Sequence, residues 1–201
     1  MEAACLKNED QLPLRLMFQD EARFGRMSDP RSCWAPAPHR PVVNLALVRE
    51  CRYEYAAVSP WDGGLDFMTA EKMNTENMSR FLDQVSKAHQ DQFIVMVVDG
   101  ASSHKSKELE VPKNVSFIRL PPYSPELNPA EQIWNILRRD YFANRVFDAL
   151  DAATTQAEFG LAEMAANKLA TRQLTNWPWI SAILKTYRKF PAKKEGKSNH
   201  R

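Results

Sequence analysis

The chain has 201 residues, of which 44% are hydrophobic and 10% aromatic, and this suits one domain with a core of ordinary size. Its three cysteines are odd in number, widely spaced and without a CxxC pair, which argues against a disulfide framework or a zinc site and favours a reducing, intracellular compartment. No secretory leader pattern opens the chain, and no apolar run approaches the roughly 20 residues that span a bilayer. We therefore expect neither secretion nor membrane insertion.

The positive charge is concentrated at the C-terminal end. The net charge is only +2, yet residues 185–201 hold seven Lys or Arg against one Glu, so the rest of the chain is slightly acidic. We predict a disordered basic tail over 185–201. Composition alone leaves two interpretations open, a contact with a polyanionic partner and a solvated tail without a partner.

The first half of the chain has the pattern of a strand-rich unit. Residues 1–13 form a lead-in, and the alternation that begins at Leu14 predicts a first strand ending at Asp20. Residues 21–41, with Gly25 and four prolines, are predicted to be irregular. Residues 42–48 and 52–59 then read as two strands, 60–64 as a turn and 65–68 as a short third arm, which together indicate an antiparallel meander.

The second half alternates helices and strands. From Asn74 the apolar residues follow a helical period, and the continuous apolar run at 93–98 predicts a strand buried on both faces. Residues 115–120 form another strand, and helices are predicted at about 130–142 and 148–169. The order of elements predicts an α/β fold with a mixed sheet flanked by helices.

Three acidic residues stand where a fold could hold a metal ion. Asp20 and Asp99 follow apolar strands, and Glu131 lies just inside a helix start. Without His or Cys beside them, such carboxylates favour Mg²⁺ or Mn²⁺ over zinc. A pair of these ions about 3.5–4 Å apart can activate a water or hydroxyl group and stabilise the leaving oxygen of a phosphodiester.

Each acid also has a structural interpretation. Asp20 before Glu21, and Asp99 before a glycine, both resemble turn residues. Asn128, a following proline and Glu131 form the pattern of a capping box, in which the Glu reaches back to the cap. Against this, Glu131 shares a helix face with Asn135 and Arg138, separate from the buried stripe, and that face could point into a cleft.

Five segments resemble the DDE transposases of the mariner-related group of bacterial insertion sequences. They are FQDEARFG (18–25), WAPAPHRPVV (34–43), VVDGASSHKS (97–106), LPPYSPELNPAEQIWNILRR (120–139) and LTNWPWI (174–180). The resemblance implies an RNase H-like fold with a mixed five-stranded sheet over 14–184. It also implies that Asp20, Asp99 and Glu131 are catalytic acids binding two divalent ions. Gly100 and Pro38 depart from the residues usual in this family, Asn and Gly, without removing a metal ligand.

The resemblance implies metal-dependent DNA strand cleavage and strand transfer during transposition. It further implies a bacterial cytoplasmic, nucleoid-associated enzyme that binds transposon ends and target DNA, as a homodimer, with a helix-turn-helix segment upstream or on a separate chain. Only 13 residues precede the first predicted strand, so the chain reads as a catalytic half, which could be inactive without those modules. The candidate DNA contacts are His104, Lys105, Arg138 and Arg139. Two alternatives stay open, a catalytically silent DNA-binding or dimerisation remnant and a general RNase H-like nuclease.

Overall fold

The protein is built on one mixed five-stranded sheet. The computed structural model describes residues 2–5, 7–99, 108–122 and 124–188. The strand order is β3-β2-β1-β4-β5, where β1 pairs antiparallel with β2 and parallel with β4, β2 pairs antiparallel with β3, and β4 pairs parallel with β5. The strands are β1 (Leu14–Met27), β2 (Leu47–Val58), β3 (Leu65–Ala70), β4 (Phe93–Val98) and β5 (Val115–Arg119).

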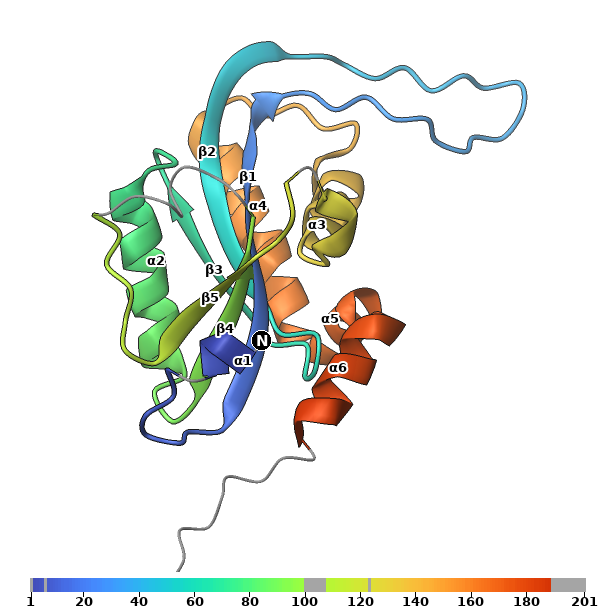
Figure 1. Ribbon diagram of the computed structural model, residues 1–201. Helices are drawn as coiled ribbons and strands as arrows, with labels where there is room; N and C mark the ends of the chain where they lie inside the picture. Colours follow the sequence, from blue (N-terminus) through green and yellow to red (C-terminus); the bar gives the residue numbers. More distant parts are fainter. Residues whose placement is uncertain (1, 6, 100–107, 123, 189–201) are drawn as a thin grey trace, which may run out of the picture.

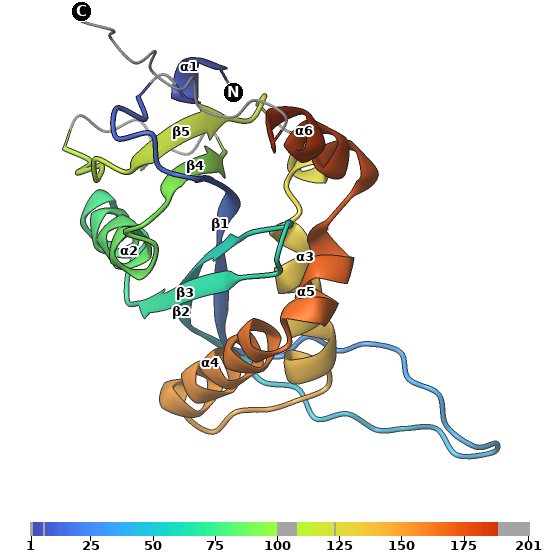
Figure 2. The same ribbon diagram turned by 90° about the horizontal axis from the view of Figure 1, so that it is seen from below.

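Helices cover both faces of the sheet. Figures 1 and 2 show α2 on one face and the helices from α3 onward on the other. In the part of the chain that the structure describes, no helix combines the length and apolar character that a membrane crossing requires. The helical elements are α1 (Glu2–Cys5), α2 (Thr75–Ala88), the single turn η2 (Pro125–Leu127), α3 (Glu131–Ile136), the π-helical η3 (Leu137–Phe142), α4 (Leu150–Ala166), α5 (Lys168–Thr175) and α6 (Pro178–Arg188).

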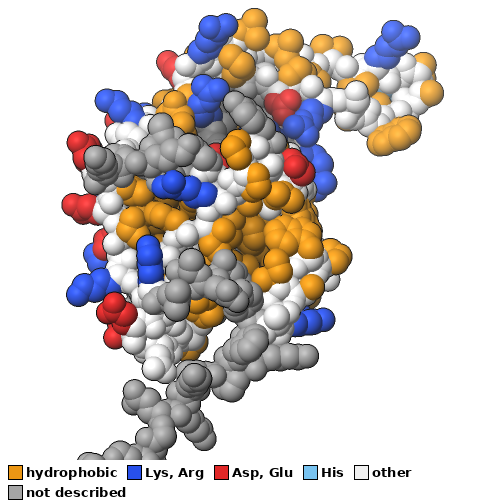
Figure 3. All heavy atoms as spheres, in the orientation of Figure 1, with side chains coloured by type: hydrophobic (Ala, Val, Ile, Leu, Met, Phe, Trp, Pro, Cys, Tyr) orange, Lys and Arg blue, Asp and Glu red, His pale blue; other side chains and the backbone are white. Residues whose placement is uncertain are grey.

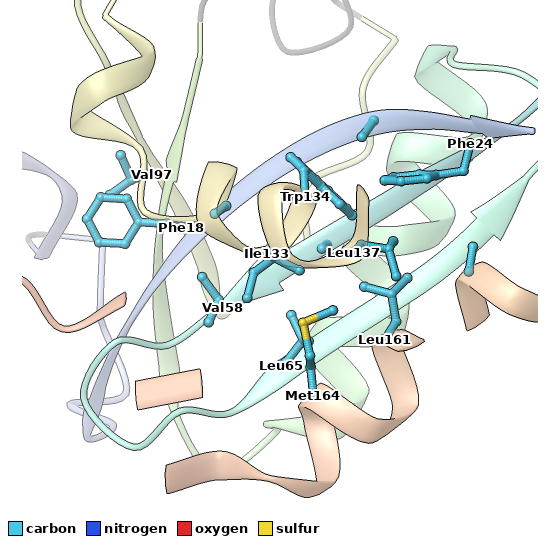
Figure 4. Packing of buried hydrophobic residues seen from close by; sticks show 14 of the residues in the cluster. Phe18, Phe24, Val58, Leu65, Val97, Ile133, Trp134, Leu137, Leu161 and Met164 are labelled. Carbon is cyan, nitrogen blue, oxygen red and sulfur yellow. The ribbon is translucent and has the colours of Figure 1, made fainter. Parts of the chain in front are cut away.

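The alternation of strand side chains produces two cores. All six residues of β4 are buried because both faces of this strand are covered. Phe18 and Val97 join the core shared with α3 and α4, which Figure 4 shows around Trp134 and Leu161. Met17 points to the opposite face and packs with the buried residues of α2. The sequence prediction of a buried central strand is therefore confirmed.

Helix α2 begins where the sequence pattern placed it. Asn74 is its N-cap, and the Asn74 side chain accepts a hydrogen bond from the Asn77 backbone N–H at 2.8 Å. The predicted apolar stripe is buried at Met78, Phe81, Leu82 and Val85. Helix α2 packs on the face of the sheet that carries Met17 and Tyr55.

Two predictions about the first strands are wrong. β1 does not end at Asp20 but continues to Met27, because Ala22 and Phe24 alternate inward and are buried. Residues 42–48 do not form a strand of their own. A single long β2 begins at Leu47, and the residues before it form an exposed arm that extends away from the body of the protein (Figure 1).

The last helices follow the predicted order with different boundaries. The predicted helix at 130–142 consists of α3 and the π-helical η3, and the predicted helix at 148–169 is divided into α4 and the start of α5. Helix α4 approaches η3 closely at Gly160, where an added Cβ would lie 2.5 Å from Leu137 Cδ1. Helix α6 extends to Arg188, and the remainder of the predicted tail, 189–201, lies outside the described residues.

Candidate active site

The candidate site begins where β1 and β4 run side by side. Their parallel register pairs Phe18 with Val97, and Asp20 and Asp99 each lie two residues further along. Asp20 lies within β1 and Asp99 directly follows the last residue of β4, so the register places both acids just beyond the end of the β1–β4 pairing. Phe18 and Val97 both belong to the core on the α3 side, and strand alternation directs Asp20 toward that side as well.

The helix that carries Glu131 is tied to the same point of β1. The Asn128 side-chain amide donates to the Gln19 carbonyl at 3.1 Å, and this bond is buried. Three residues after Glu131, the Trp134 indole Nε1–H donates to Asp20 Oδ2 at 2.9 Å. Both hydrogen bonds join the start of α3 to residues 19 and 20, so the fold itself brings Glu131 beside Asp20.

Only the Asn128 half of the alternative capping-box interpretation is present. The Asn128 Oδ1 accepts a hydrogen bond from the Ala130 backbone N–H at 3.1 Å, as an N-cap side chain does, while its Nδ2 bonds to β1. The Asn128 backbone N–H, which would donate to Glu131 in a capping box, donates instead to the Pro125 carbonyl at 2.9 Å. Glu131 thus lacks the structural role that competed most directly with metal binding.

Electrostatics at Asp20 reflect its crowded setting. The pKa of the Asp20 carboxyl is raised from 3.8 to about 7, first by burial and next by the negative charge of Glu131, while the hydrogen bond from Trp134 lowers it. Asp20 is only 9% exposed, and Glu131 is half-buried. Two carboxylates are therefore held close together where water cannot fully solvate them.

The types of ligand atom at this site are suited to a divalent cation. The three acids offer only hard oxygen ligands, which Mg²⁺ and Mn²⁺ prefer, and a cation would offset the repulsion between Asp20 and Glu131. As they stand, no three His, Cys, Asp or Glu side chains within the described ranges are grouped closely enough to hold a metal ion. The chemistry of the ligands fits a cation, and Glu131 lies close enough to Asp20 for its charge to raise the Asp20 pKa.

The candidate DNA contacts differ in their surroundings. The Arg138 guanidinium lies 5.4 Å from the centre of the Phe24 ring, which is four residues beyond Asp20 on β1. Arg139 instead makes two hydrogen bonds to Asp140, at 2.6 and 2.8 Å, on the exposed side of the helix. His104 and Lys105 lie outside the described residues.

Trp134 is the site residue that sequence reasoning missed. Its position in an apolar stripe identified it only as a core side chain, and it is indeed 1% exposed. A buried indole N–H nevertheless requires an acceptor. Its spacing of three residues from Glu131, on a helix expected to face Asp20, was the signal that could have identified the bond.

Sequence and structure comparisons identify the class. Residues 15–154 match the family model described as DDE superfamily endonuclease, and the chain belongs to this family. The Uncharacterized protein y4pE/y4sA of Sinorhizobium fredii (strain NBRC 101917 / NGR234) is 34% identical over 104 residues, which cover 51% of this chain and 77% of that protein. The assignment to the DDE transposases, which the sequence resemblance implied, is thereby confirmed.

The fold is shared with solved transposase structures. The Mos1 transposase paired-end complex with left transposon end has a TM-score of 0.53 at 10% identity, covering 87% of this chain and 59% of that one. The mariner Mos1 paired end complex with Mg has a TM-score of 0.53 at 15% identity, covering 84% and 55%. The chain thus spans somewhat more than half the length of these proteins. The predicted RNase H-like fold is confirmed.

Proposed function

We propose that this chain is a transposase catalytic domain that cleaves DNA strands and joins them to target DNA, using divalent metal ions. The observation that carries the proposal is the setting of Asp20 on β1, whose carboxylate accepts a hydrogen bond from Trp134 of α3 and whose pKa is raised in part by the charge of Glu131 on the same helix. Membership of the DDE superfamily endonuclease family supports the reaction class. The Mn- and Mg-containing Mos1 complexes support the choice of metal by analogy.

Asp20, Asp99 and Glu131 are the proposed metal ligands. When bound, two Mg²⁺ or Mn²⁺ ions would supply Lewis-acid activation of the attacking oxygen and charge stabilisation for the leaving oxygen of a phosphodiester. The protein contributes rigid placement, because β1, β4 and α3 belong to one packed core. Asp20 must lose its proton to become a ligand, and its raised pKa makes this step dependent on pH near neutrality.

Trp134 positions Asp20 in this proposal. Its hydrogen bond to Oδ2 fixes the direction of the Asp20 carboxylate. The bond also favours the ionised form, since it lowers the Asp20 pKa. A neutral donor is suited to this role because it orients the carboxylate without competing with a cation for the site.

Arg138 is the proposed phosphate contact on α3. It carries no carboxylate partner within the described residues, and its stacking on Phe24 holds the guanidinium near the acidic site. Arg139 is less suited, because Asp140 already neutralises it. DNA is the proposed partner, in a homodimer that works with a helix-turn-helix segment on the same or another chain. His104 and Lys105 stay proposed contacts from the sequence resemblance.

The experiment compares metal binding and DNA cleavage in the intact chain and in Asp99→Asn. Mn²⁺ binding is followed by calorimetry, and cleavage is followed by nicking of supercoiled plasmid at high protein concentration. The matched control is Asp91→Asn, an exposed aspartate at the opposite end of β4. We expect Asp99→Asn to lose both activities and the control to keep both.

The outcomes separate the candidate functions. Cleavage that persists in Asp99→Asn would refute the assignment of the site. Failure of the intact chain to bind Mn²⁺ or cut DNA, with DNA binding retained, would favour the silent DNA-binding or dimerisation remnant. Preferential cleavage of RNA in an RNA–DNA hybrid would favour a general RNase H-like nuclease.

A further inference from the structure

A row of three residues crosses the sheet just beyond the acidic site. The register pairs Arg23 of β1 with Tyr53 of β2, and Tyr53 with Ala70 of β3. Tyr53 packs against the core that contains Tyr55 and the buried side of α2, so this row lies on the α2 face of the sheet. Arg23 is three residues from Asp20, or about 10 Å along the strand.

Helix α2 stops short of this row. The Asn74 backbone N–H at the start of the helix donates to the Tyr55 hydroxyl at 3.2 Å, and that hydroxyl donates to the Lys72 carbonyl at 3.4 Å. The helix therefore begins beside Tyr55, which is two residues from Tyr53 on β2. The row at Tyr53 lies beyond the start of the helix. Tyr53 is left partly exposed and Arg23 exposed. No helix among the described residues covers the α2 face of the sheet at this row.

The arginines on the two faces of the β1–β2 pair differ in their ion-pair partners. On the α4 face, Arg26 pairs with Glu50 at 2.9 Å and Arg52 pairs with Glu71 at 3.2 Å. On the α2 face, Arg23 makes no ion pair with any residue that the structure describes. Figure 3 shows Lys and Arg side chains on the surface near the upper part of β1 and β2, above α2.

The acidic residue nearest along this face is Glu21, which the register pairs with Tyr55. Glu21 lies between Asp20 and Arg23 in the sequence, and its charge acts on the buried Tyr55 hydroxyl, whose pKa is raised to about 12 mainly by burial. Lys72 is exposed and is the second residue after β3, next to the row. The α2 face therefore carries two exposed positive side chains, Arg23 and Lys72, beside the Tyr53 ring, with Glu21 one cross-strand pair away.

We infer that Arg23 and Tyr53 form a binding surface for a DNA strand that passes from the acidic site, on the α3 side of the sheet, around the unpaired side of β1 and across the α2 face. The inference rests on the proposed function, because it takes DNA as the substrate. Arg23 would contact a backbone phosphate, and the Tyr53 ring would stack on a base or sugar, a combination that binds single strands with little dependence on sequence. Lys72 adds a second positive charge to the same surface.

The test measures binding of a fluorescein-labelled single-stranded oligonucleotide by anisotropy, in EDTA, from 50 to 200 mM salt. The variants are Arg23→Gln, Arg23→Lys, Tyr53→Leu and Tyr53→Phe. The control is Lys113→Gln, which removes the same charge from an exposed loop at the far end of β5. Circular dichroism establishes that each variant is folded.

We expect Arg23→Gln to weaken binding by about 3–10-fold and to make the salt slope less negative by roughly 0.7, because one phosphate contact is lost. Arg23→Lys should retain the slope of the parent chain. Tyr53→Leu should weaken binding by roughly 5-fold or more through lost stacking, and Tyr53→Phe should stay within about 2-fold. Lys113→Gln should leave affinity and slope unchanged.

Each contrary outcome has a distinct meaning. If Arg23→Gln and Tyr53→Leu bind like the control, the surface does not bind DNA and the inference is overturned while the proposed function stands. If the substitutions change the sedimentation coefficient but not DNA affinity, the surface is a protein interface and the inference is again overturned. If the intact chain binds no DNA at 50 mM salt, both the inference and the proposed function fail.

Discussion

Glu54 provides the sharpest test of the energetics of this fold. It lies on β2, is fully buried, and its Oε2 accepts a hydrogen bond from the Thr69 hydroxyl at 2.8 Å. Its Oε1 has no hydrogen-bond partner within the part of the chain that the structure describes. Burial raises its pKa from 4.5 to about 7, the Thr69 bond opposes the rise, and the charge of Glu158 on α4 adds to it.

The sign of the pH effect follows from this shift. Because the folded pKa lies above the unfolded value, the native state favours the protonated form. Stability from this group is fully present below about pH 4.5 and is lost as the pH rises to about 7, above which the loss is constant. A difference of about 2.5 pKa units corresponds to about 3 kcal/mol in the free energy of unfolding.

The perturbation is Glu54→Gln, measured by urea unfolding with tryptophan fluorescence at pH 4.5 and pH 8. Glutamine keeps the shape of the side chain and an acceptor for Thr69 but cannot ionise. We expect the variant to lie within about 1 kcal/mol of the parent at pH 4.5 and to be about 3 kcal/mol more stable at pH 8. Asp20 titrates in a similar range, but it is present in both proteins and cancels in the comparison.

Glu126→Gln is the control, since Glu126 is exposed. It should leave the difference between the two pH values unchanged. The reasoning would be refuted by parallel pH profiles for the parent and Glu54→Gln, with equal urea m-values. Such a result would mean that the Glu54 carboxyl is solvated or paired in solution.

Three further predictions concern the site and the fold. Trp134→Phe should raise the Asp20 pKa and weaken Mn²⁺ binding more at pH 6.5 than at pH 8, as seen by calorimetry, because a hydrogen bond to the ionised carboxylate is lost. Gly63→Ala should lower the free energy of unfolding, measured with urea, by about 2 kcal/mol, because Gly63 has φ +73° and its added Cβ would collide with the α5 backbone. Arg138→Gln should weaken DNA binding in anisotropy assays by about 3–10-fold, whereas Arg139→Gln should have little effect.

The elements that were predicted correctly from the sequence are those whose residue pattern has a single physical cause. The run at 93–98 is apolar because β4 is covered on both faces, and Asn74 marks the start of α2 because its side chain caps that helix. β1 was shortened in the prediction because Asp20 and Glu21 interrupt its alternation. A functional acid in the middle of a strand looks like a strand end to any argument based on polarity.

The geometry of the site depended on contacts between distant segments. The three acids could be named from local context and family resemblance, but the bond between Trp134 and Asp20 joins residues 114 positions apart. Asn128 likewise looked only like a helix cap, since its bond to the Gln19 carbonyl of β1 leaves no trace in the local sequence. The exposure of Arg23 depends on where α2 begins relative to β2. The apolar periodicity of the sequence does not specify that position.

The mixed pairing of β1 has a consequence for motion. From Leu14 to Phe18 the strand pairs with β4, and from Phe18 onward it pairs with β2, so the pairing of β1 changes partner at Phe18. Asp20 lies two residues beyond this change, on the part of β1 that is paired with β2 and not with β4. The amide hydrogens of this part should exchange with solvent through local openings that leave the pairing of β1 with β4 intact. The chain around Asp20 can in this way adjust to a bound strand without disturbing the parallel half of the sheet.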